Sequence, residues 1–135
     1  GLYHSIEVSK GKYIMKGEVK SFWQELLPEQ NLHVSPGQKV YFYTAVFAPA
    51  ELKTKIIHRW QYYDQVKEEW TDVGELPFEI VGGRKEGYKG YSFMSDLAQG
   101  EWRIYAQNQR GQVLGRIKFN VEKVDEPVEL REVVR

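Results

Sequence analysis

The chain has 135 residues and no cysteine, and it balances 19 Lys and Arg against 19 Asp and Glu. A chain of this length builds one hydrophobic core by default, and a hydrophobic content of 41% excludes disorder for most of it. The missing cysteines exclude disulfides, zinc–thiolate sites and thiol nucleophiles, and the neutral total lacks the basic excess of duplex-binding proteins, so we expect no nucleic-acid partner.

The N-terminal part of the chain predicts short strands and one helix-like segment. Loose alternation over residues 2–8 and the pattern over 12–19 indicate two strands, in line with an aromatic content of 14%. Residues 21–30 have the only helix-like composition, and Pro28 stops that pattern within about two turns. Residues 35–38 predict a turn because they contain Pro followed by Gly.

The middle of the chain predicts the strands of the core. Residues 39–47 are apolar on both faces, which is typical of a central strand, and residues 54–63 alternate. The row of 54–63 that we expect to face inward consists of Ile56, His58, Trp60 and Tyr62. Residues 68–73 indicate an edge strand, and 76–80 and 88–94 indicate two more.

The last predicted hairpin has the clearest pattern. In its first strand we expect Trp102, Ile104 and Ala106 to face inward. Residues 108–112 form the turn, where Gly111 is available for a left-handed backbone conformation. In the return strand we expect Val113, Ile117, Phe119 and Val121 to be buried.

Turn signals recur about every 8–12 residues, and no segment leaves room for parallel crossover helices. The sequence therefore predicts an all-β fold, an immunoglobulin-like antiparallel β-sandwich. We expect one domain over residues 1–124 and a charged, loosely held C-terminal tail over 125–135 that contains Pro127. Since the chain begins with Gly1 rather than Met, we expect it to be a piece or a processed form of a larger protein.

Several short motifs, taken together in order and spacing, resemble a known family. They are His58-Arg59-Trp60, Tyr91-Ser92, Gly100-Glu101-Trp102-Arg103-Ile104, Gly111-Gln112-Val113-Leu114-Gly115 and Phe119-Asn120-Val121. Over roughly residues 40–121 the chain resembles the bacterial domain-of-unknown-function family numbered 2914. The resemblance implies an extracytoplasmic β domain of a membrane protein, with no catalytic residues and no established activity. Two departures are Lys89-Gly90 ahead of Tyr91-Ser92, where the family usually has an Arg-x-Trp-Ser-like stretch, and the segment before residue 30.

A candidate site follows from the expected topology. In such a sandwich the long middle strand pairs with the penultimate strand, which pairs with the last. Their outward rows would form one surface, made of Arg59, Gln61, Tyr63, Arg103, Tyr105, Gln107, Arg116 and Lys118. The candidate ligand-binding residues among them are Arg59, Gln61, Tyr63, Arg103, Tyr105 and Arg116. This surface suits an anionic glycan, another carboxylate or a lipid head group. A solvated face neutralised by carboxylates on neighbouring strands is the alternative.

No motif predicts catalysis. His58 shares the apolar row, which favours a buried neutral imidazole that donates to a backbone carbonyl, and we expect no catalytic residue, metal or cofactor. Two other classes remain open. The chain suits a carbohydrate-binding module of a larger secreted enzyme, with Trp23, Trp70, Tyr63 and Tyr105 as candidate platforms, or a domain that docks a protein through the edge at 68–73.

The function that the sequence favours is a non-catalytic binding or interaction domain of a bacterial membrane protein. We expect it to be periplasmic or otherwise extracytoplasmic, and membrane-tethered through a part outside this chain. Its partner would be an unknown protein, an anionic glycan or a small ligand, in an oligomeric state that the sequence does not predict.

Overall fold

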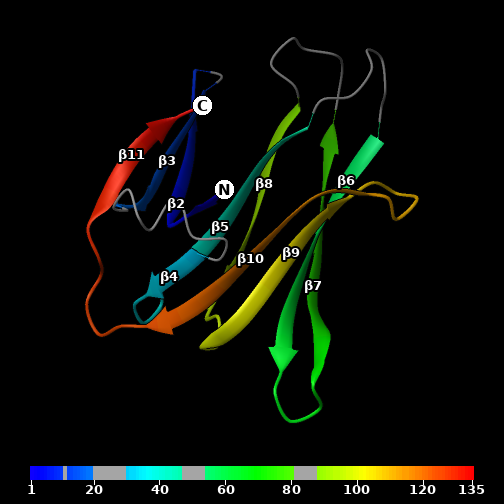
Figure 1. Cartoon of the computed structure of the whole chain (residues 1–135). Coiled ribbons are helices and arrows are strands. Elements are labelled where there is room, and N and C mark those ends of the chain that lie inside the picture. Colours follow the sequence, from blue (N-terminus) through cyan, green and yellow to red (C-terminus); the bar gives the residue numbers. More distant parts are fainter. Residues whose placement is uncertain (11, 20–29, 47–53, 81–87) are drawn as a thin grey trace. The chain divides into compact units, whose positions relative to one another are not determined.

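The computed structural model describes residues 1–10, 12–19, 30–46, 54–80 and 88–135 (Figure 1). These residues form eleven strands and no helix, so they hold no helix long and apolar enough to cross a membrane. The helix-like segment expected over 21–30 lies, except for Gln30, outside the described residues.

The strands are β1 Leu2–Tyr3, β2 Ser5–Ser9, β3 Lys12–Glu18, β4 Gln30–Val34, β5 Lys39–Val46, β6 Thr54–Asp64, β7 Glu69–Ile80, β8 Tyr88–Ser95, β9 Gly100–Gln107, β10 Val113–Lys123 and β11 Leu130–Val134. The segments expected to form an edge strand at 68–73 and a further strand at 76–80 are one continuous strand, β7.

The chain divides into two compact units. The terminal unit comprises Gly1–Phe42, Phe93–Gly100 and Phe119–Arg135, and the central unit comprises Tyr43–Ser92 and Glu101–Lys118. The single domain expected over residues 1–124 stays a prediction.

The central unit contains the long strands that the alternating sequence predicts. Strands β10, β9, β6 and β7 are neighbours in that order. Strand β6 pairs antiparallel with β7 from Thr54↔Ile80 to Asp64↔Glu69, and the register shifts by a β-bulge at Trp60/Gln61. It also pairs antiparallel with β9. The predicted pairing of the middle strand with the penultimate strand, and of that strand with the return strand, is therefore confirmed.

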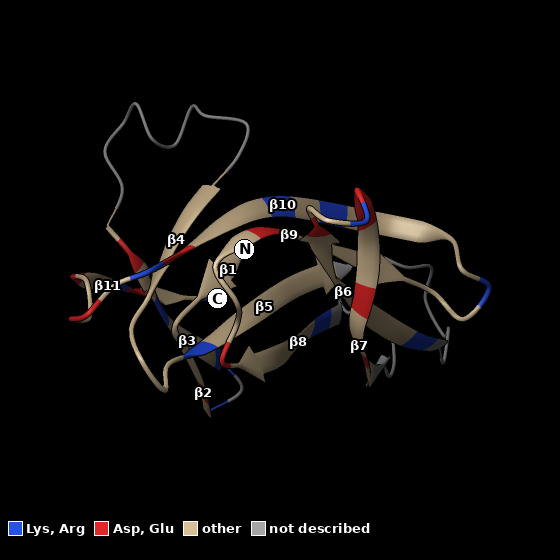
Figure 2. Ribbon diagram, turned by 90° about the horizontal axis from the view of Figure 1, so that it is seen from below, with Lys and Arg blue, Asp and Glu red and all other residues tan. Residues whose placement is uncertain are grey.

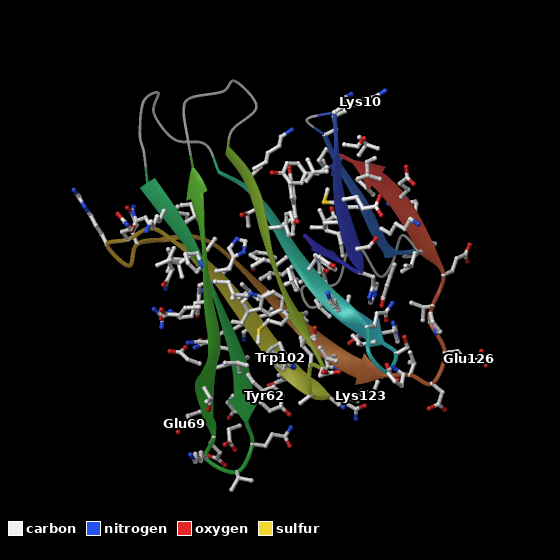
Figure 3. All side chains as sticks on the ribbon, turned by 180° about the vertical axis from the view of Figure 1, so that it is seen from behind. Lys10, Tyr62, Glu69, Trp102, Lys123 and Glu126 are labelled. Carbon is white, nitrogen blue, oxygen red and sulfur yellow. The ribbon has the colours of Figure 1, made fainter. Side chains whose placement is uncertain are left out.

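The core of the central unit is the inward row of these strands. Ile56, His58 and Trp60 of β6 are 0% exposed. The inward row of β9 consists of Trp102, Ile104 and Ala106, all buried. Tyr62 packs on Trp102 with ring centroids 4.9 Å apart (Figure 3). Burying large apolar side chains contributes about 1.5–3 kcal/mol each. The predicted row of β9 is confirmed as core, and so is that of β6 except for Tyr62, which is only half-buried.

Two strands of a second sheet face this row within the central unit. Thr44 of β5 and Ser92 of β8 both contact the His58 side chain. Strands β5 and β8 are neighbours in a sheet separate from that of β6. Two sheets that meet across one buried layer make a β-sandwich. The chain is therefore an all-β, immunoglobulin-like sandwich, as the sequence predicts.

The terminal unit contains shorter strands. Strands β11, β3 and β2 form an antiparallel sheet, and β1 pairs antiparallel with β5. Strand β4 runs parallel to β10 over Phe119–Lys123. The buried apolar side chains of this unit are Leu2, Ile6, Met15, Leu32, Val34, Val40, Phe42, Leu97, Phe119 and Val121.

Three details correct the sequence-based expectations. The pairing of β4 with β10 is parallel, so the sandwich is not wholly antiparallel. The tail is not loosely held throughout, because Leu130–Val134 form β11 and pair with β3 along its length. Of the four side chains of the return strand expected to be buried, Val113 is 47% exposed and Ile117 is only half-buried.

Candidate functional site

The predicted outward residues of β6 and β9 lie side by side. The register pairs Arg59 with Tyr105 and Gln61 with Arg103. In register with them on β7 lie Trp70 opposite Tyr63, Asp72 opposite Gln61 and Glu75 opposite Arg59. We call this surface of β7, β6, β9 and the first half of β10 the outer face.

The charge of Arg59 is neutralised on this face. Its Nη1 lies 2.9 Å from Asp72 Oδ2, and its Nη2 lies 2.7 Å from Glu75 Oε1. Its Nε donates to Gln107 Oε1 over 3.2 Å. Acidic residues lie on β7 and basic residues on β10 (Figure 2). At Arg59 the structure therefore matches the alternative expectation, in which carboxylates on a neighbouring strand neutralise the basic residues. The outer face is not uniformly cationic.

The Asp72 carboxyl is held in its ionised form. The Gln61 amide donates to Asp72 Oδ1 over 2.5 Å and lowers the pKa of this carboxyl, and the positive charges of Arg59 and Arg103 lower it further. A carboxylate that accepts hydrogen bonds beside cations stays charged at neutral pH.

Arg103 is held differently, by aromatic rings. Its Cζ lies 4.2 Å from the ring centroid of Trp70 and 5.0 Å from that of Tyr105. Its Nε donates to Gln61 Oε1 over 2.6 Å. Lys118 Nζ lies 5.7 Å from the same Trp70 centroid. Cation–π contacts of this kind attract a guanidinium to the face of an aromatic ring.

These contacts form one group of side chains on the outer face. We call it the Trp70 cluster, and it consists of Tyr63, Trp70, Arg103, Tyr105 and Lys118. Tyr63 contacts Trp70 with ring centroids 5.2 Å apart. Arg103 is half-buried, and no described carboxylate lies within 4.0 Å of its guanidinium. The planar fork of a guanidinium can bind an oxyanion through two parallel hydrogen bonds.

The structure brings together five of the six predicted ligand-binding residues, namely Arg59, Gln61, Tyr63, Arg103 and Tyr105. Arg116 lies exposed on β10, and no contact in the described residues joins it to the Trp70 cluster. Their role in ligand binding stays a prediction.

Sequence reasoning allowed for carboxylates on neighbouring strands but did not identify Asp72 and Glu75 as the acidic side of this face. Regular alternation from Trp70 places Asp72 and Gly74 on one side of β7, and leaves Glu75 on the other. The β-bulge opposite Trp60/Gln61 inserts one residue, which turns Glu75 toward Arg59. The sequence could have indicated Asp72, because it follows Trp70 by two residues and alternation places both on the same face of β7.

His58 belongs to the core rather than to a site. Its Nδ1 lies 2.6 Å from Ser92 Oγ and its Nε2 lies 2.9 Å from Thr44 Oγ1. Trp60 Nε1 donates to the same Ser92 oxygen over 3.0 Å. Burial lowers the pKa of His58 to about 3, so the imidazole is neutral at physiological pH. At 0% exposure it is out of reach of a substrate in solvent.

A second cluster of ionisable side chains lies in the terminal unit. Glu18 Oε1 accepts from His4 Nε2 over 3.1 Å and from the His33 backbone N–H over 2.5 Å, and Glu18 Oε2 lies 3.1 Å from His33 Nδ1. His33 Nε2 lies 3.4 Å from Glu122 Oε2. In the described ranges, no group of three or more His, Cys, Asp and Glu residues is arranged to hold a metal ion.

The Glu18 carboxyl stays ionised despite its position. Burial alone raises the pKa of this group, but hydrogen bonds from His4 and from the backbone and ring of His33 outweigh it, so the pKa lies below its ordinary value. Glu18 therefore joins the end of β3 to β4 as a buried acceptor.

The terminal unit also contains a pocket of about 360 Å³. It lies between the turn at Ser35–Gln38 and the residues Asp96, Leu97 and Lys123–Asp125. The turn has the predicted form, with Gly37 at φ +77° and a hydrogen bond from Gln38 N to Ser35 O. No predicted site residue lines this pocket.

Comparison with known proteins gives one family. Residues 53–121 match DUF2914, which is described as a protein of unknown function. No curated protein sequence matches the chain.

Comparison with solved structures gives two partial matches. The alkylpurine DNA glycosylase AlkC of Pseudomonas fluorescens, bound to DNA containing an abasic site analog, is 14% identical, with a TM-score of 0.43. The match covers 68% of this chain but 27% of the glycosylase. An immunoglobulin-like protein from Pseudomonas aeruginosa is 15% identical over 90% of this chain and 97% of its own, with a TM-score of 0.39.

Proposed function

Since this chain belongs to the DUF2914 family of proteins of unknown function, we propose from its outer face that it is a non-catalytic binding domain. The ligand is an anionic saccharide or a similar oxyanion-bearing molecule, bound at the Trp70 cluster. The observation that carries this proposal is Arg103, which makes cation–π contacts with Trp70 and Tyr105 and donates to Gln61, with no carboxylate partner in the described residues.

The arrangement favours an oxyanion over a neutral sugar. A neutral pyranose binds by stacking on an open aromatic face, whereas Trp70 is contacted by Arg103, Lys118 and Tyr63. Trp60 and Trp102 are buried and present no face to solvent. The cations on Trp70 suit a carboxylate or sulfate group, so the carbohydrate-binding alternative is favoured only for acidic sugars.

The binding test compares charged and neutral saccharides of the same size. Trigalacturonate is titrated into the protein at low salt and followed by calorimetry, with maltotriose as the neutral control. We expect binding of trigalacturonate that weakens as salt is added, because the contact is ionic and partly exposed. Equal binding of both sugars, or of neither, contradicts the proposal.

Variants then locate the site. Arg103→Ala is expected to weaken trigalacturonate binding by about tenfold or more, since it removes a paired donor group. Arg110→Ala, in the exposed turn between β9 and β10, is the matched control and is expected to change nothing. Loss of binding in both variants points to diffuse charge attraction and contradicts a site at Arg103.

We also propose that the domain lies on the extracytoplasmic side of a bacterial membrane and is tethered through a part of the protein outside this chain. The support is the resemblance of its motifs to the family. Protease added to spheroplasts that express the full-length protein is expected to digest the domain without lysis. Protection until the cells are lysed contradicts this location.

A further inference from the structure

The pocket of the terminal unit is built where two parallel strands end. Strands β4 and β10 pair up to Val34 and Lys123 (Figure 1). A hydrogen bond of 3.0 Å from Val124 N to Val34 O continues this pairing by one residue. Every residue that lines the pocket lies in the described ranges and belongs to the terminal unit, so the pocket is a feature of that unit alone.

The turn that forms one wall of the pocket is held in shape by Gln38. Its backbone N–H donates to Ser35 O over 3.1 Å, and its side-chain Oε1 accepts from Ser35 N over 3.1 Å and from Ser35 Oγ over 3.2 Å. These bonds use the amide oxygen and leave the Nε2 hydrogens of Gln38 without a partner among the described residues. A donor that is fixed in place and used by no protein group is available to a ligand.

Three charged side chains line the same pocket without being paired. They are Asp96, Lys123 and Asp125. In the part of the chain that the structure describes, no basic group lies within 4.0 Å of either carboxylate, and no carboxylate lies within 4.0 Å of the Lys123 ammonium. The pocket therefore presents charges of both signs that the protein itself leaves free for a ligand.

The pocket also has an apolar part of limited size. Val34 and Leu97 are buried, and Pro36 and Val124 add two more apolar side chains to the lining. A volume of about 360 Å³ equals that of about twelve water molecules. Small-molecule sites bury an apolar body and orient it through a few polar groups, and this pocket has both features.

We propose that this pocket binds a small zwitterion of dipeptide size, which has an apolar body, a free ammonium group and a free carboxylate. The ligand ammonium contacts the carboxylates of Asp96 and Asp125. The ligand carboxylate contacts Lys123 and the Gln38 amide, and the apolar body covers Leu97. A ligand with only one charge leaves either Lys123 or the two aspartates without a partner in the complex, which costs affinity.

The binding test uses three ligands that share one apolar body. Leucyl-leucine carries both charges, 4-methylpentanoyl-leucine lacks the ammonium group, and leucyl-leucinamide lacks the carboxylate. Each ligand is titrated into the full chain, and the NMR shifts of the backbone amides of Gly37, Leu97 and Val124 report binding. We expect leucyl-leucine to bind, and each singly charged ligand to bind at least about threefold more weakly. No binding of leucyl-leucine, or a singly charged ligand that binds as tightly, overturns the proposal.

Three neutralising variants then test the individual charges. Asp96→Asn, Asp125→Asn and Lys123→Met are each expected to weaken leucyl-leucine binding by about threefold to fivefold, because each removes one partly exposed ion pair. Asn suits position 96, because Asp96 has a φ of +56° and Asn also adopts this left-handed conformation. Glu7→Gln, exposed on β2 of the same unit, is the matched control and is expected to change nothing. Unchanged affinity in Lys123→Met, or in both aspartate variants, overturns the proposal.

A last variant separates this pocket from the Trp70 cluster, whose residues all belong to the central unit. Arg103→Ala is expected to leave leucyl-leucine binding unchanged while it weakens trigalacturonate binding, and Lys123→Met is expected to do the reverse. Loss of leucyl-leucine binding in Arg103→Ala would mean that the dipeptide binds at the Trp70 cluster, and would overturn the proposed pocket site while leaving the saccharide site unaffected.

Discussion

Arg103 Nε donates to Gln61 Oε1 over 2.6 Å, directly across the pairing of β9 with β6. The same Gln61 side chain donates from its Nε2 to Asp72 Oδ1. One amide therefore joins the stacked guanidinium of Arg103 to the acidic group on β7, and keeps the two at fixed positions. Arg103 and Asp72 are thus joined through Gln61 rather than by a direct ion pair, and Asp72 forms its ion pair with Arg59.

The first prediction concerns this link. Gln61→Leu keeps the size of the side chain but removes both hydrogen bonds. We expect the pKa of Asp72 to rise toward its ordinary value, because the Gln61 hydrogen bond is the largest influence that lowers it. We expect trigalacturonate binding to weaken by about threefold to tenfold, since Arg103 loses its orientation.

The pKa of Asp72 is measured by NMR titration of its carboxyl carbon. Gln109→Leu, in the exposed turn between β9 and β10, is the control and should change neither quantity. A pKa of Asp72 that stays unchanged in Gln61→Leu contradicts the role given to this amide.

The second prediction concerns the buried hydroxyl of Ser92. Ser92→Ala leaves Trp60 Nε1 and His58 Nδ1 without this partner in the core. We expect the free energy of unfolding to fall by about 1–3 kcal/mol, which is the cost of a buried polar group left unsatisfied. Urea unfolding at pH 7.5 measures the loss.

Ser95→Ala is the matched control for that variant, because Ser95 is exposed at the end of the same strand, β8. We expect it to change the free energy of unfolding by less than about 0.5 kcal/mol. An equal effect of both substitutions contradicts a stabilising role for the buried hydroxyl.

How far the sequence predicts this molecule depends on the length of each strand and on how many large apolar side chains it buries. Alternation in β6 and β9 predicts the buried rows, because these strands are long and their inward side chains are large. Strand β4 is not predicted, since it has only five residues and buries only Leu32 and Val34. Strand β11 is not predicted either, because none of its five side chains is fully buried and its sequence shows no apolar row.

The candidate site shows a similar limit. The outward row of Arg59, Gln61, Arg103 and Tyr105 follows from alternation and one assumed pairing, and the structure has it. Glu75 does not follow, because a β-bulge changes which side chains of β7 face Arg59. The contact of Arg103 with Trp70 cannot be predicted from alternation either, since it depends on side-chain conformations across several strands.

The third prediction concerns the dependence of stability on pH through His58. Its pKa in the folded chain is about 3, below the ordinary value of 6.5, because burial disfavours the charged imidazole. As the pH falls, His58 is therefore protonated in the unfolded chain at a higher pH than in the folded chain. Above about pH 6.5 the titration of His58 does not lower the free energy of unfolding. As the pH is lowered from 6.5 to 3, that free energy falls by up to about 1.4 kcal/mol per pH unit.

Urea unfolding at pH 7.5, 6.0 and 5.0 measures this slope. His58→Gln cannot take up the proton, so we expect it to be less stable at pH 7.5 but to lose less stability between pH 6.5 and 5. A slope that is the same in both proteins means that another group titrates, and contradicts the prediction.

The fourth prediction concerns Glu18, which accepts from His4 and His33 in the terminal unit. Its pKa in the folded chain lies below the ordinary value of 4.5, so the folded chain binds this proton less readily than the unfolded chain. The contribution of Glu18 is therefore fully present above about pH 4.5 to 5, and it is lost as the pH falls through the folded pKa.

Glu18→Gln removes this titration but keeps the shape of the side chain. We expect the variant to be less stable at pH 7 by about 1–3 kcal/mol, because a neutral amide replaces a buried acceptor of three hydrogen bonds. We expect its stability relative to wild type to recover as the pH falls below 4.5. Glu7→Gln, exposed on β2, is the control, and it should follow wild type at every pH. A constant difference between Glu18→Gln and wild type from pH 7 to 3 would show that Glu18 does not link acid pH to the stability of this unit.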